Sequence, residues 1–223
     1  MYSCINNLLY DKIPSTDVRK GWWVDTSLKS PLLEHVTWDG VSGDDVAGLT
    51  IDNVKMAFLP YTNVKFGMNT VGGTLNDDDW PFMRVEEMIL IQIEGLAKSG
   101  SPAQAKAMLE DFIRTYRDPA YSADAAGRSL EDEIWFQRRV ELWGEGFSNN
   151  DPRRLNKPLV RFHGGEDSNV PEAFRFNMPA DDGWWLMRFT NSELNTNLAV
   201  VDNTGGSSPD QDQHPDLRDG VTD

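Results

Sequence analysis

The sequence predicts a mainly α-helical protein, built from helix hairpins that are joined by long loops and a few short strands. Two observations predict this fold class. Apolar residues recur every three or four positions between residues 81 and 147, and signals for new helix starts interrupt that pattern twice. The flanking segments are rich in Gly, Asp, Asn and Pro, which is typical of turns and extended chain. In residues 1–80 we expect short strands or loops, for example at 54–59 and 63–66.

The first predicted helix begins at Pro81. Its apolar stripe consists of Val85, Met88, Ile89, Ile93 and Leu96. Leu90 and Ile91 widen that stripe, which predicts burial on more than one side of the helix. Gly100 follows where a left-handed residue usually ends a helix, and Lys98 lies in the last turn, where the helix dipole favours a cation.

A second helix begins almost at once. Ser101 and Gln104 have the spacing of a capping box, and Pro102 suits the first helical position. The stripe that follows consists of Ala105, Met108, Leu109, Phe112 and Tyr116. Pro119 ends the helix. Two helices joined by so short a turn are expected to pack antiparallel as a hairpin.

A third helix is predicted from Ser129, where Asp132 completes another capping box, through Phe147. The residues Asn149 to Pro152 are expected to stop it. Three helices within about 65 residues suggest tetratricopeptide-like helix pairs, although the strict consensus of that repeat is absent.

Composition excludes several classes of protein. The net charge of −15 argues against sequence-independent nucleic-acid binding, which needs clustered Lys and Arg. A single cysteine, Cys4, excludes an internal disulfide framework and a thiolate zinc cluster, and the three histidines show no metal-binding pattern. No apolar run approaches the ~20 residues that span a bilayer, and residues 1–7 do not read as a signal peptide. Residues 204–223, with five acidic and one basic side chain, are expected to form a disordered acidic tail.

Four segments carry a family resemblance. Residues 84–96 read RVEEMILIQIEGL, 137–146 read QRRVELWGEG, 151–155 read DPRRL and 189–197 read FTNSELNTN. In this order, and with DVRK at 17–20, they resemble the C-terminal half of the SusD/RagB family of outer-membrane nutrient-binding lipoproteins. This chain departs from the family pattern at several positions, including Gln137, Phe189 and Thr190.

The resemblance implies that residues 1–203 form a SusD-like C-terminal region. We expect a loop-rich part at 1–80, a helical core at 81–155 and a loop-rich closing segment at 156–203. It further implies a surface-exposed position on the outer membrane, a lipid anchor in a longer full-length protein, and a SusC-like TonB-dependent transporter as partner. Cys4 is not preceded by an apolar stretch, so it is not expected to be the lipidated residue. No cofactor is implied.

Charged and polar residues of these segments are interpreted as a structural network. They are Arg84, Glu87, Glu94, Arg138, Arg139, Glu141, Glu145, Asp151, Arg154, Glu193, Asn195 and Asn197. Helical spacing predicts pairs of Arg84 with Glu87, Glu94 with Lys98, and Arg138 with Glu141. The same residues allow two functional interpretations: Glu87 and Glu94 as a catalytic carboxylate pair, and the arginines of 138–154 as an anion-binding pocket. Ion pairing accounts for both sets more simply.

Tryptophans are the candidate ligand-binding residues. The chain has eight, and those in polar segments are Trp22, Trp23, Trp38, Trp184 and Trp185. A flat indole ring can stack on the C–H face of a sugar or on a peptide, although packing in the core is the more common role of tryptophan.

The sequence therefore predicts a non-enzymatic protein that binds an oligosaccharide or another nutrient. A peptide-binding family member and a free-standing helical-repeat interaction module stay open as alternatives, and a glycoside hydrolase comes last. We identify no catalytic set and no metal-binding set in the sequence.

Overall fold

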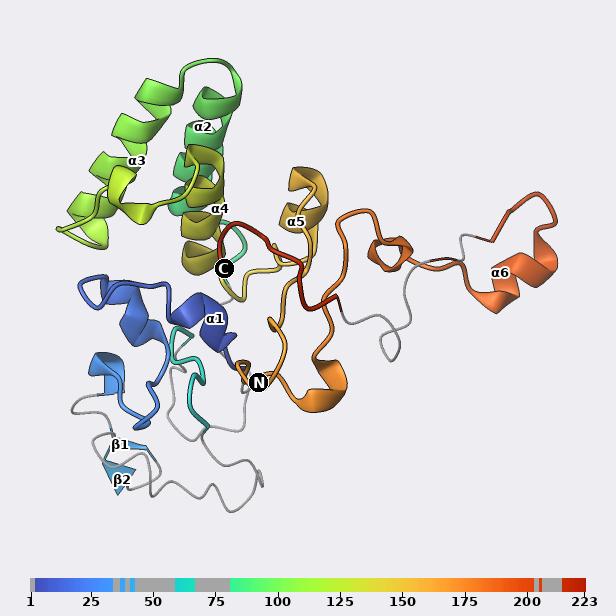
Figure 1. Cartoon of the computed structure of the whole chain (residues 1–223), viewed down its shortest axis with the longest axis horizontal. Coiled ribbons are helices and arrows are strands. Elements are labelled where there is room, and N and C mark those ends of the chain that lie inside the picture. Colours follow the sequence, from blue (N-terminus) through green and yellow to red (C-terminus); the bar gives the residue numbers. More distant parts are fainter. Residues whose placement is uncertain are drawn as a thin grey trace. The chain divides into compact units, whose positions relative to one another are not determined.

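The computed structural model describes residues 3–33, 37–38, 41–42, 59–66, 81–202, 205 and 214–223, and these residues are mainly helical (Figure 1). The chain divides into two compact units, Met1–Glu141 and Leu142–Asp223. The boundary between the two units therefore lies within the helical core that the sequence predicts for residues 81–155, inside the third predicted helix.

The first unit contains the long helices. In chain order its elements are α1 (Asn7–Tyr10), η1 (Val18–Trp22), η2 (Pro31–Leu33), β1 (Thr37–Trp38), β2 (Val41–Ser42), α2 (Val85–Lys98), α3 (Pro102–Tyr116), η4 (Asp124–Ala126) and α4 (Leu130–Glu141), where η denotes a 3-10 helix. The two short strands pair antiparallel.

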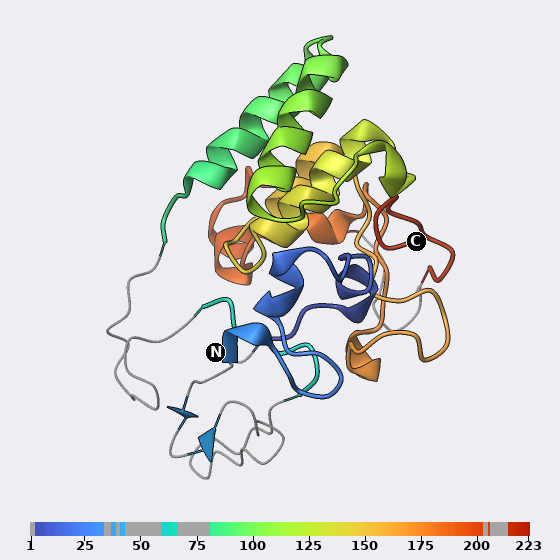
Figure 2. The same cartoon turned by 90° about the vertical axis from the view of Figure 1, so that its left-hand side faces the viewer.

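Helices α2 and α3 form the predicted hairpin, and Figure 2 shows them side by side. Gly100, between them, has a left-handed φ of 88°, as expected for a residue that ends a helix. Ser101 is the N-cap of α3 and Pro102 is its first residue, but the Ser101 side chain makes no capping hydrogen bond. Its backbone carbonyl accepts from the amide of Ala105 at 3.0 Å. The hairpin is confirmed, whereas the capping box at its start is not formed.

The core-facing side of α2 differs from the prediction. Leu90 and Ile93 are fully buried, while Val85, Met88 and Ile91 are 68%, 40% and 48% exposed. The helix contacts α3 and α4 through the side that contains Leu90, so the stripe predicted from periodicity is only partly buried. Because α2 is apolar on two sides, the spacing of its apolar residues does not show which side faces the core.

Helix α3 buries the side that its stripe predicts, apart from Met108, which is half-buried, and Tyr116 at the end, which is exposed. Helix α4 begins as expected, because Ser129 Oγ accepts from the amide of Asp132 at 3.1 Å. The predicted extension of α4 to Phe147 is wrong, since the helix ends at Glu141. Gly144 and Gly146, with φ of 80° and 94°, turn the chain out of helical geometry.

The N-terminal segments have little regular structure, yet they supply much of the core of the first unit. Ile5, Ile13, Trp23 and Val24 are at most 1% exposed. Isolated β-bridges join Cys4 to Thr62 and Trp23 to Asn63. The strand predicted at 63–66 is thus reduced to a single bridge, and most of the strand predicted at 54–59 lies outside the described residues.

The second unit is built from short elements: α5 (Asn150–Leu155), η5 (Glu172–Phe174), η6 (Gly183–Trp185) and α6 (Asn191–Thr196). Helix α5 forms where a stop was predicted. The side-chain amide of Asn177 holds this unit together. Its Oδ1 accepts from the amides of Arg161 and Phe162 at 2.7 and 3.2 Å, and its Nδ2 donates to the carbonyl of His214 at 3.0 Å.

The end of the chain is ordered, contrary to the expected disordered tail. Val221 is 2% exposed, and Asp219 Oδ1 accepts from the amides of Val221 and Thr222 at 2.8 and 2.7 Å. Lys157 donates to the carbonyl of Asp219 at 3.1 Å. The expectation is therefore wrong for residues 214–223, because local hydrogen bonds offset the low apolar content there. Residues 204 and 206–213 lie outside the described part of the chain.

Candidate functional site

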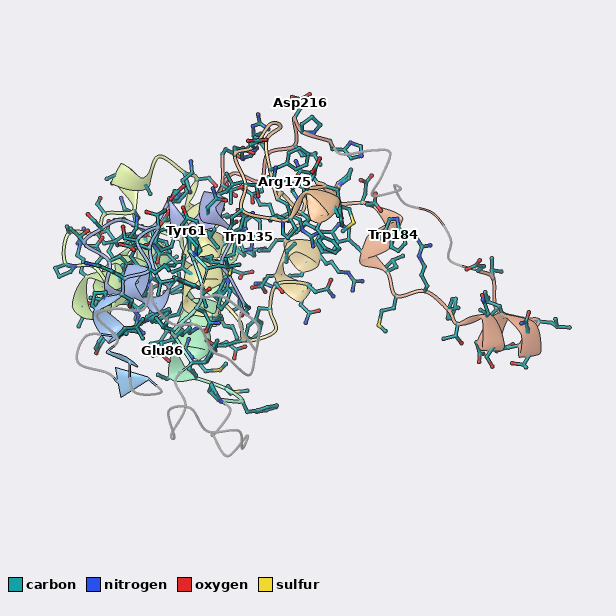
Figure 3. The ribbon with its side chains drawn as sticks, turned by 90° about the horizontal axis from the view of Figure 1, so that it is seen from below. Tyr61, Glu86, Trp135, Arg175, Trp184 and Asp216 are labelled. Carbon is teal, nitrogen blue, oxygen red and sulfur yellow. The ribbon has the colours of Figure 1, made fainter. Side chains whose placement is uncertain are left out.

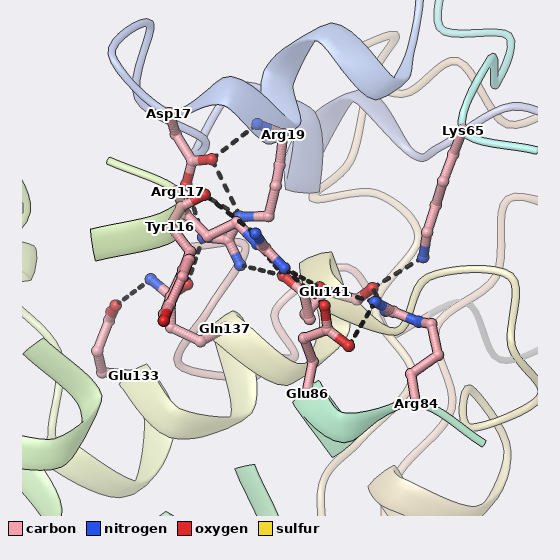
Figure 4. A network of polar contacts seen from close by, with 10 residues as sticks. All are labelled: Asp17, Arg19, Lys65, Arg84, Glu86, Tyr116, Arg117, Glu133, Gln137 and Glu141. Carbon is pink, nitrogen blue, oxygen red and sulfur yellow. Dashed lines mark hydrogen bonds and ion pairs between the residues drawn. The ribbon is translucent and has the colours of Figure 1, made fainter. Parts of the chain in front are cut away.

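The most connected group in the first unit is the carboxylate of Glu141, the last residue of α4. It is fully buried and is contacted by three arginines from three separate segments (Figure 4). Arg117, which follows α3, donates from Nε and Nη2 at 2.8 and 2.9 Å. Arg84, which precedes α2, lies at 3.1 Å, and Arg19 of η1 lies at 3.4 Å. Three guanidinium groups therefore converge on one carboxylate.

The backbone carbonyl of Glu141 extends this site. It accepts from Arg84 Nη2 and from Lys65 Nζ, each at 2.8 Å. Lys65 comes from the segment 59–66, which has no helix or strand of its own. Glu86, in the first turn of α2, bridges Arg84 and Arg117 at 3.1 Å each. The end of α4 is thus connected to loops on both sides of the helix hairpin.

A second branch of the network runs through Arg19. Its guanidinium pairs with Asp17 at 2.6 Å and donates to Gln137 Oε1. Gln137 in turn donates to Glu133 Oε1 at 2.8 Å, one helical turn earlier in α4. The side-chain amide of Gln137 therefore bridges a buried carboxylate and a buried guanidinium by hydrogen bonds, which requires both a donor and an acceptor.

Glu133 completes this branch. Tyr121 donates to its Oε1 at 2.8 Å, and Arg128 lies 2.9 Å from its Oε2. Burial and then the charge of Glu133 raise the pKa of Tyr121, so the phenol keeps its proton and serves as a donor.

The electrostatics of Glu141 follow from its partners. Burial alone would raise the pKa of Glu141, but the hydrogen bond from Arg117 and the charges of the surrounding arginines outweigh burial and lower it. Burial likewise works against the charge of Arg117, and Glu141 more than compensates, so the pKa of Arg117 is raised. Both groups stay ionised near neutral pH. A carboxylate held by three cations and shielded from solvent is suited to joining segments, and it is poorly placed to exchange a proton with a ligand.

Several of the predicted structural residues meet partners, though not always those expected. Arg84 pairs with Glu86 and Glu141, whereas helical spacing predicts an ion pair of Arg84 with Glu87. Glu94 and Lys98 form the expected pair at 3.5 Å. In the first unit, Arg138 is buried on α4 and Arg139 lies 4.7 Å over the ring of Trp135.

In the second unit, Asp151 and Arg154 form an ion pair at 2.8 Å within α5. Asn197 donates to Glu193 at 2.8 Å along α6, and Asn195 is exposed there. Glu145 lies in the turn region that follows α4.

Sequence reasoning missed three of the cations that contact α4, two at Glu141 and one at Glu133. Arg117, Lys65 and Arg128 lie outside the motifs, and their contacts with α4 join residues far apart in the chain or across a turn. Arg19 could have been found from the sequence, because Asp17 and Arg19 belong to one of the segments that carry the family resemblance.

The candidate ligand-binding tryptophans are placed very differently. Trp23 is fully buried and Trp185 is 8% exposed, with its indole N–H donating to the carbonyl of Pro179 at 2.8 Å. A ring without exposed surface cannot stack on a ligand, so the binding role expected for Trp23 and Trp185 is wrong and both are packing residues. The side chain of Trp38 lies outside the described part of the structure.

Two of the candidate tryptophan rings in the described residues reach the surface. Trp22 is half-buried, with Lys65 and Arg117 over its ring at 4.8 and 5.9 Å. Trp184, labelled in Figure 3, is 52% exposed and extends from η6 of the second unit. Arg188 lies 5.0 Å from the centre of the Trp184 ring. An exposed aromatic ring beside a cation offers both a stacking surface and a hydrogen-bond donor.

Within the described residues, no cluster of three or more His, Cys, Asp or Glu is arranged to hold a metal ion. None of the helices described is both long enough and apolar enough to cross a membrane.

Comparison with known proteins agrees with the motifs. The sequence model of the SusD family matches residues 39–205. The fold resembles the crystal structure of a SusD-like carbohydrate binding protein from Bacteroides vulgatus, with a TM-score of 0.59 and 23% sequence identity. The match covers 89% of this chain and 41% of that one, so this chain spans less than half the length of the solved protein. No curated protein matches the sequence significantly.

We predict that replacing Glu141 by Leu destabilises the protein by about 3–5 kcal/mol, because three arginines would lose their buried counter-charge. Urea unfolding followed by circular dichroism measures this change. The matched control is Glu94→Gln, since Glu94 pairs with a half-exposed lysine and should contribute less than about 1 kcal/mol. Equal small effects of the two substitutions would show that the network does not stabilise the fold.

The lowered pKa of Glu141 predicts a specific pH dependence. A carboxyl group with a lowered folded-state pKa contributes stability above its unfolded-state value of about 4.3, and this contribution is lost as the pH falls through the folded-state pKa. The stability difference between the wild type and Glu141→Gln should therefore shrink as the pH is lowered from 7 toward 3. Urea unfolding at a series of pH values checks this, and a difference that stays constant with pH would contradict it.

Proposed function

Because the chain belongs to the SusD family, we propose that it is a nutrient-binding protein of the bacterial cell surface, which captures a glycan and does not alter it chemically. The solved protein that it resembles is described as carbohydrate binding, which supports a glycan as the ligand class. The observation from this chain that carries the proposal is the exposed indole ring of Trp184.

The chemistry around Trp184 suits a sugar. The face of the ring that Arg188 does not cover can stack on the apolar C–H face of a pyranose. The Arg188 guanidinium, which lies over the ring and also donates to the carbonyl of Gly205, has five N–H donors and can add a hydrogen bond to a hydroxyl oxygen. Trp184 is held in place by its backbone amide, which donates to Asp182 Oδ1 at 2.8 Å and begins η6. Trp22 is a weaker candidate, because it is half-buried and two cations, Lys65 and Arg117, lie over its ring, whereas Trp184 is 52% exposed and has one.

The ion pairs made by the candidate carboxylates support a binding role without catalytic turnover. Glycoside hydrolysis needs two carboxyl groups that flank the scissile bond. Glu94 is paired with Lys98, and the carboxylate of Glu141 is enclosed by arginines. Of the two carboxylates considered as a catalytic pair, Glu94 is thus engaged in an ion pair, and we propose capture of the ligand and its transfer to another protein.

Titration with a panel of soluble polysaccharides tests the glycan proposal. We expect at least one of them to change the tryptophan fluorescence and to bind measurably by calorimetry. Trp184→Ala should weaken that binding about 3- to 10-fold, which corresponds to the ~0.5–1.5 kcal/mol of an aromatic contact, and Trp184→Phe should retain most of it. A response to peptides and to none of the glycans would favour the peptide-binding alternative, and catalytic turnover of a glycan would contradict the binding-only role.

We further propose that the receiving protein is a SusC-like TonB-dependent transporter and that the full-length protein is lipid-anchored on the outer-membrane surface. Family membership supports this partner and location. Expression together with a SusC-like transporter from the same bacterium should allow the two to be purified together, with tagging of either protein recovering the other. Failure of both tags to recover the partner would favour the interpretation as a free-standing helical-repeat module.

A further inference from the structure

A turn in the first unit holds a tyrosine in an unusual backbone conformation. In this turn the amide of Thr62 donates to the carbonyl of Leu59 at 3.1 Å. Pro60 occupies the second position of the turn and Tyr61 the third, where its φ is 69°. This is the pattern of a type II turn, whose third position favours Gly or Asn because a bulky side chain strains the left-handed conformation.

Hydrogen bonds on both sides of Tyr61 keep the turn in this conformation. The amide of Tyr61 donates to the carbonyl of Val24 at 2.9 Å, and its carbonyl accepts from the amide of Ile5 at 3.1 Å. The hydroxyl of Thr62 donates to the carbonyl of Leu59 at 2.7 Å. A strained residue persists where its surroundings determine the backbone, and such residues are frequent at ligand-binding sites. Because Gly or Asn would form this turn with less strain, it is the side chain of Tyr61 that needs an explanation.

The side chain of Tyr61 is partly exposed and rests on a second tyrosine. Its ring meets the ring of Tyr10 edge to face, with the two centroids 5.1 Å apart. Tyr10 is 7% exposed, and Lys20 lies 4.9 Å over its ring, so Tyr10 is a fixed support. Among the described residues, the hydroxyl of Tyr61 has no hydrogen-bond partner. The contact with Tyr10 therefore fixes the Tyr61 ring and leaves its hydroxyl group available to a ligand.

A carboxylate lies near this hydroxyl group. Asp11 caps the end of α1 and is exposed, and its carboxylate contacts neither a cation nor a hydrogen-bond donor in the part of the chain that the structure describes. Burial, and then the charge of Asp11, raise the pKa of Tyr61. The phenol therefore keeps its proton at neutral pH and can donate a hydrogen bond, while the Asp11 carboxylate can only accept.

We propose that Tyr61 and Asp11 form a sugar-binding subsite of the first unit, which takes a neutral sugar unit. This inference rests on the proposed function and deepens it, and the subsite is separate from Trp184 of the second unit. The exposed part of the Tyr61 ring packs on the C–H face of the sugar, and its phenol donates to a hydroxyl oxygen. The Asp11 carboxylate accepts hydrogen bonds from neighbouring sugar hydroxyl groups.

The charges around this subsite favour an uncharged sugar. Burial, and then charges that include those of Asp25 and Asp11, raise the pKa of Tyr10, so both carboxylates act on this region. Lys20, which lies over the Tyr10 ring, already donates to the carbonyl of Ile13 at 2.6 Å. A carboxylated or sulfated sugar would meet these two carboxylates in a chain whose net charge is −15, and like charges repel.

Titration calorimetry of the 223-residue chain tests the subsite. The neutral probes are xyloglucan, laminarin, inulin and galactomannan, and the anionic probes are chondroitin sulfate and polygalacturonate. Tyr61→Asn, which suits the turn, should weaken binding of the neutral glycan about 3- to 10-fold, and Asp11→Asn should weaken it about 10-fold. Tyr61→Phe keeps the ring and should have a smaller effect than Tyr61→Asn. The matched control is Leu28→Asn, because Leu28 also has a left-handed φ, of 60°, and its replacement should leave binding unchanged.

A second measurement locates the contact on the protein. Tetranitromethane nitrates accessible tyrosine rings, and mass spectrometry of peptides identifies the modified residue. The bound neutral glycan should slow the nitration of Tyr61 and leave that of Tyr116, which is 61% exposed, unchanged. Circular dichroism melting of each variant shows whether the fold is retained.

The outcomes separate this subsite from the proposed function. If none of the glycans binds, the proposed function fails and the subsite fails with it. If a neutral glycan binds with unchanged affinity to Tyr61→Asn, Tyr61→Phe and Asp11→Asn, or leaves the nitration of Tyr61 unchanged, the subsite is overturned while glycan capture stands. Tighter binding of an anionic probe than of every neutral one would overturn the assignment of a neutral sugar.

Discussion

The first unit depends on one buried carboxylate. Glu141 ends α4, and its side chain and backbone carbonyl together bind four cations, which come from η1, from just before α2, from just after α3 and from the segment 59–66. Two of these segments have almost no regular secondary structure of their own. These segments make few regular backbone hydrogen bonds with the hairpin, such as the one from the amide of Val18 to the carbonyl of Arg117 at 2.9 Å, so long-range side-chain contacts add to what fixes their position. The network around Glu141 provides such contacts.

The arrangement also explains why so many charges are tolerated inside the unit. Removing an ion from water costs several kcal/mol, and this cost is offset only where every charge has a partner and a complete set of hydrogen bonds. In this network Glu141 and Glu86 each contact more than one guanidinium group (Figure 4), and Asp17 and Glu133 each pair with one arginine. Its members are Asp17, Arg19, Lys65, Arg84, Glu86, Arg117, Tyr121, Arg128, Glu133, Gln137 and Glu141. Such a network makes the packing specific, because only one position of the loops along the helix lets every charged group in it reach its partner.

Local signals in the sequence predicted local structure well. The hairpin of α2 and α3, the left-handed Gly100 and the start of α4 at Ser129 all follow from spacing and capping chemistry over a few residues. The same reasoning failed where the deciding contact is distant. Nothing near Arg117 indicates that it binds Glu141, and nothing in α2 indicates that Leu90, rather than Val85, faces the core. Glu141 itself was predicted as a structural residue, because it belongs to a motif, but its main partners were not.

The two adjacent tryptophan pairs show how this fold can expose an aromatic ring. In each pair one ring is buried, Trp23 in the first unit and Trp185 in the second, while the ring before it reaches the surface. Both pairs lie at the end of a 3-10 helix, where the chain changes to an extended conformation and successive side chains point to different sides. The buried ring fixes the backbone, so the exposed ring loses little further conformational freedom when a ligand stacks on it. A sequence pattern of two consecutive tryptophans therefore predicts an anchored and an exposed ring, although only the structure shows that Trp184 is the exposed member.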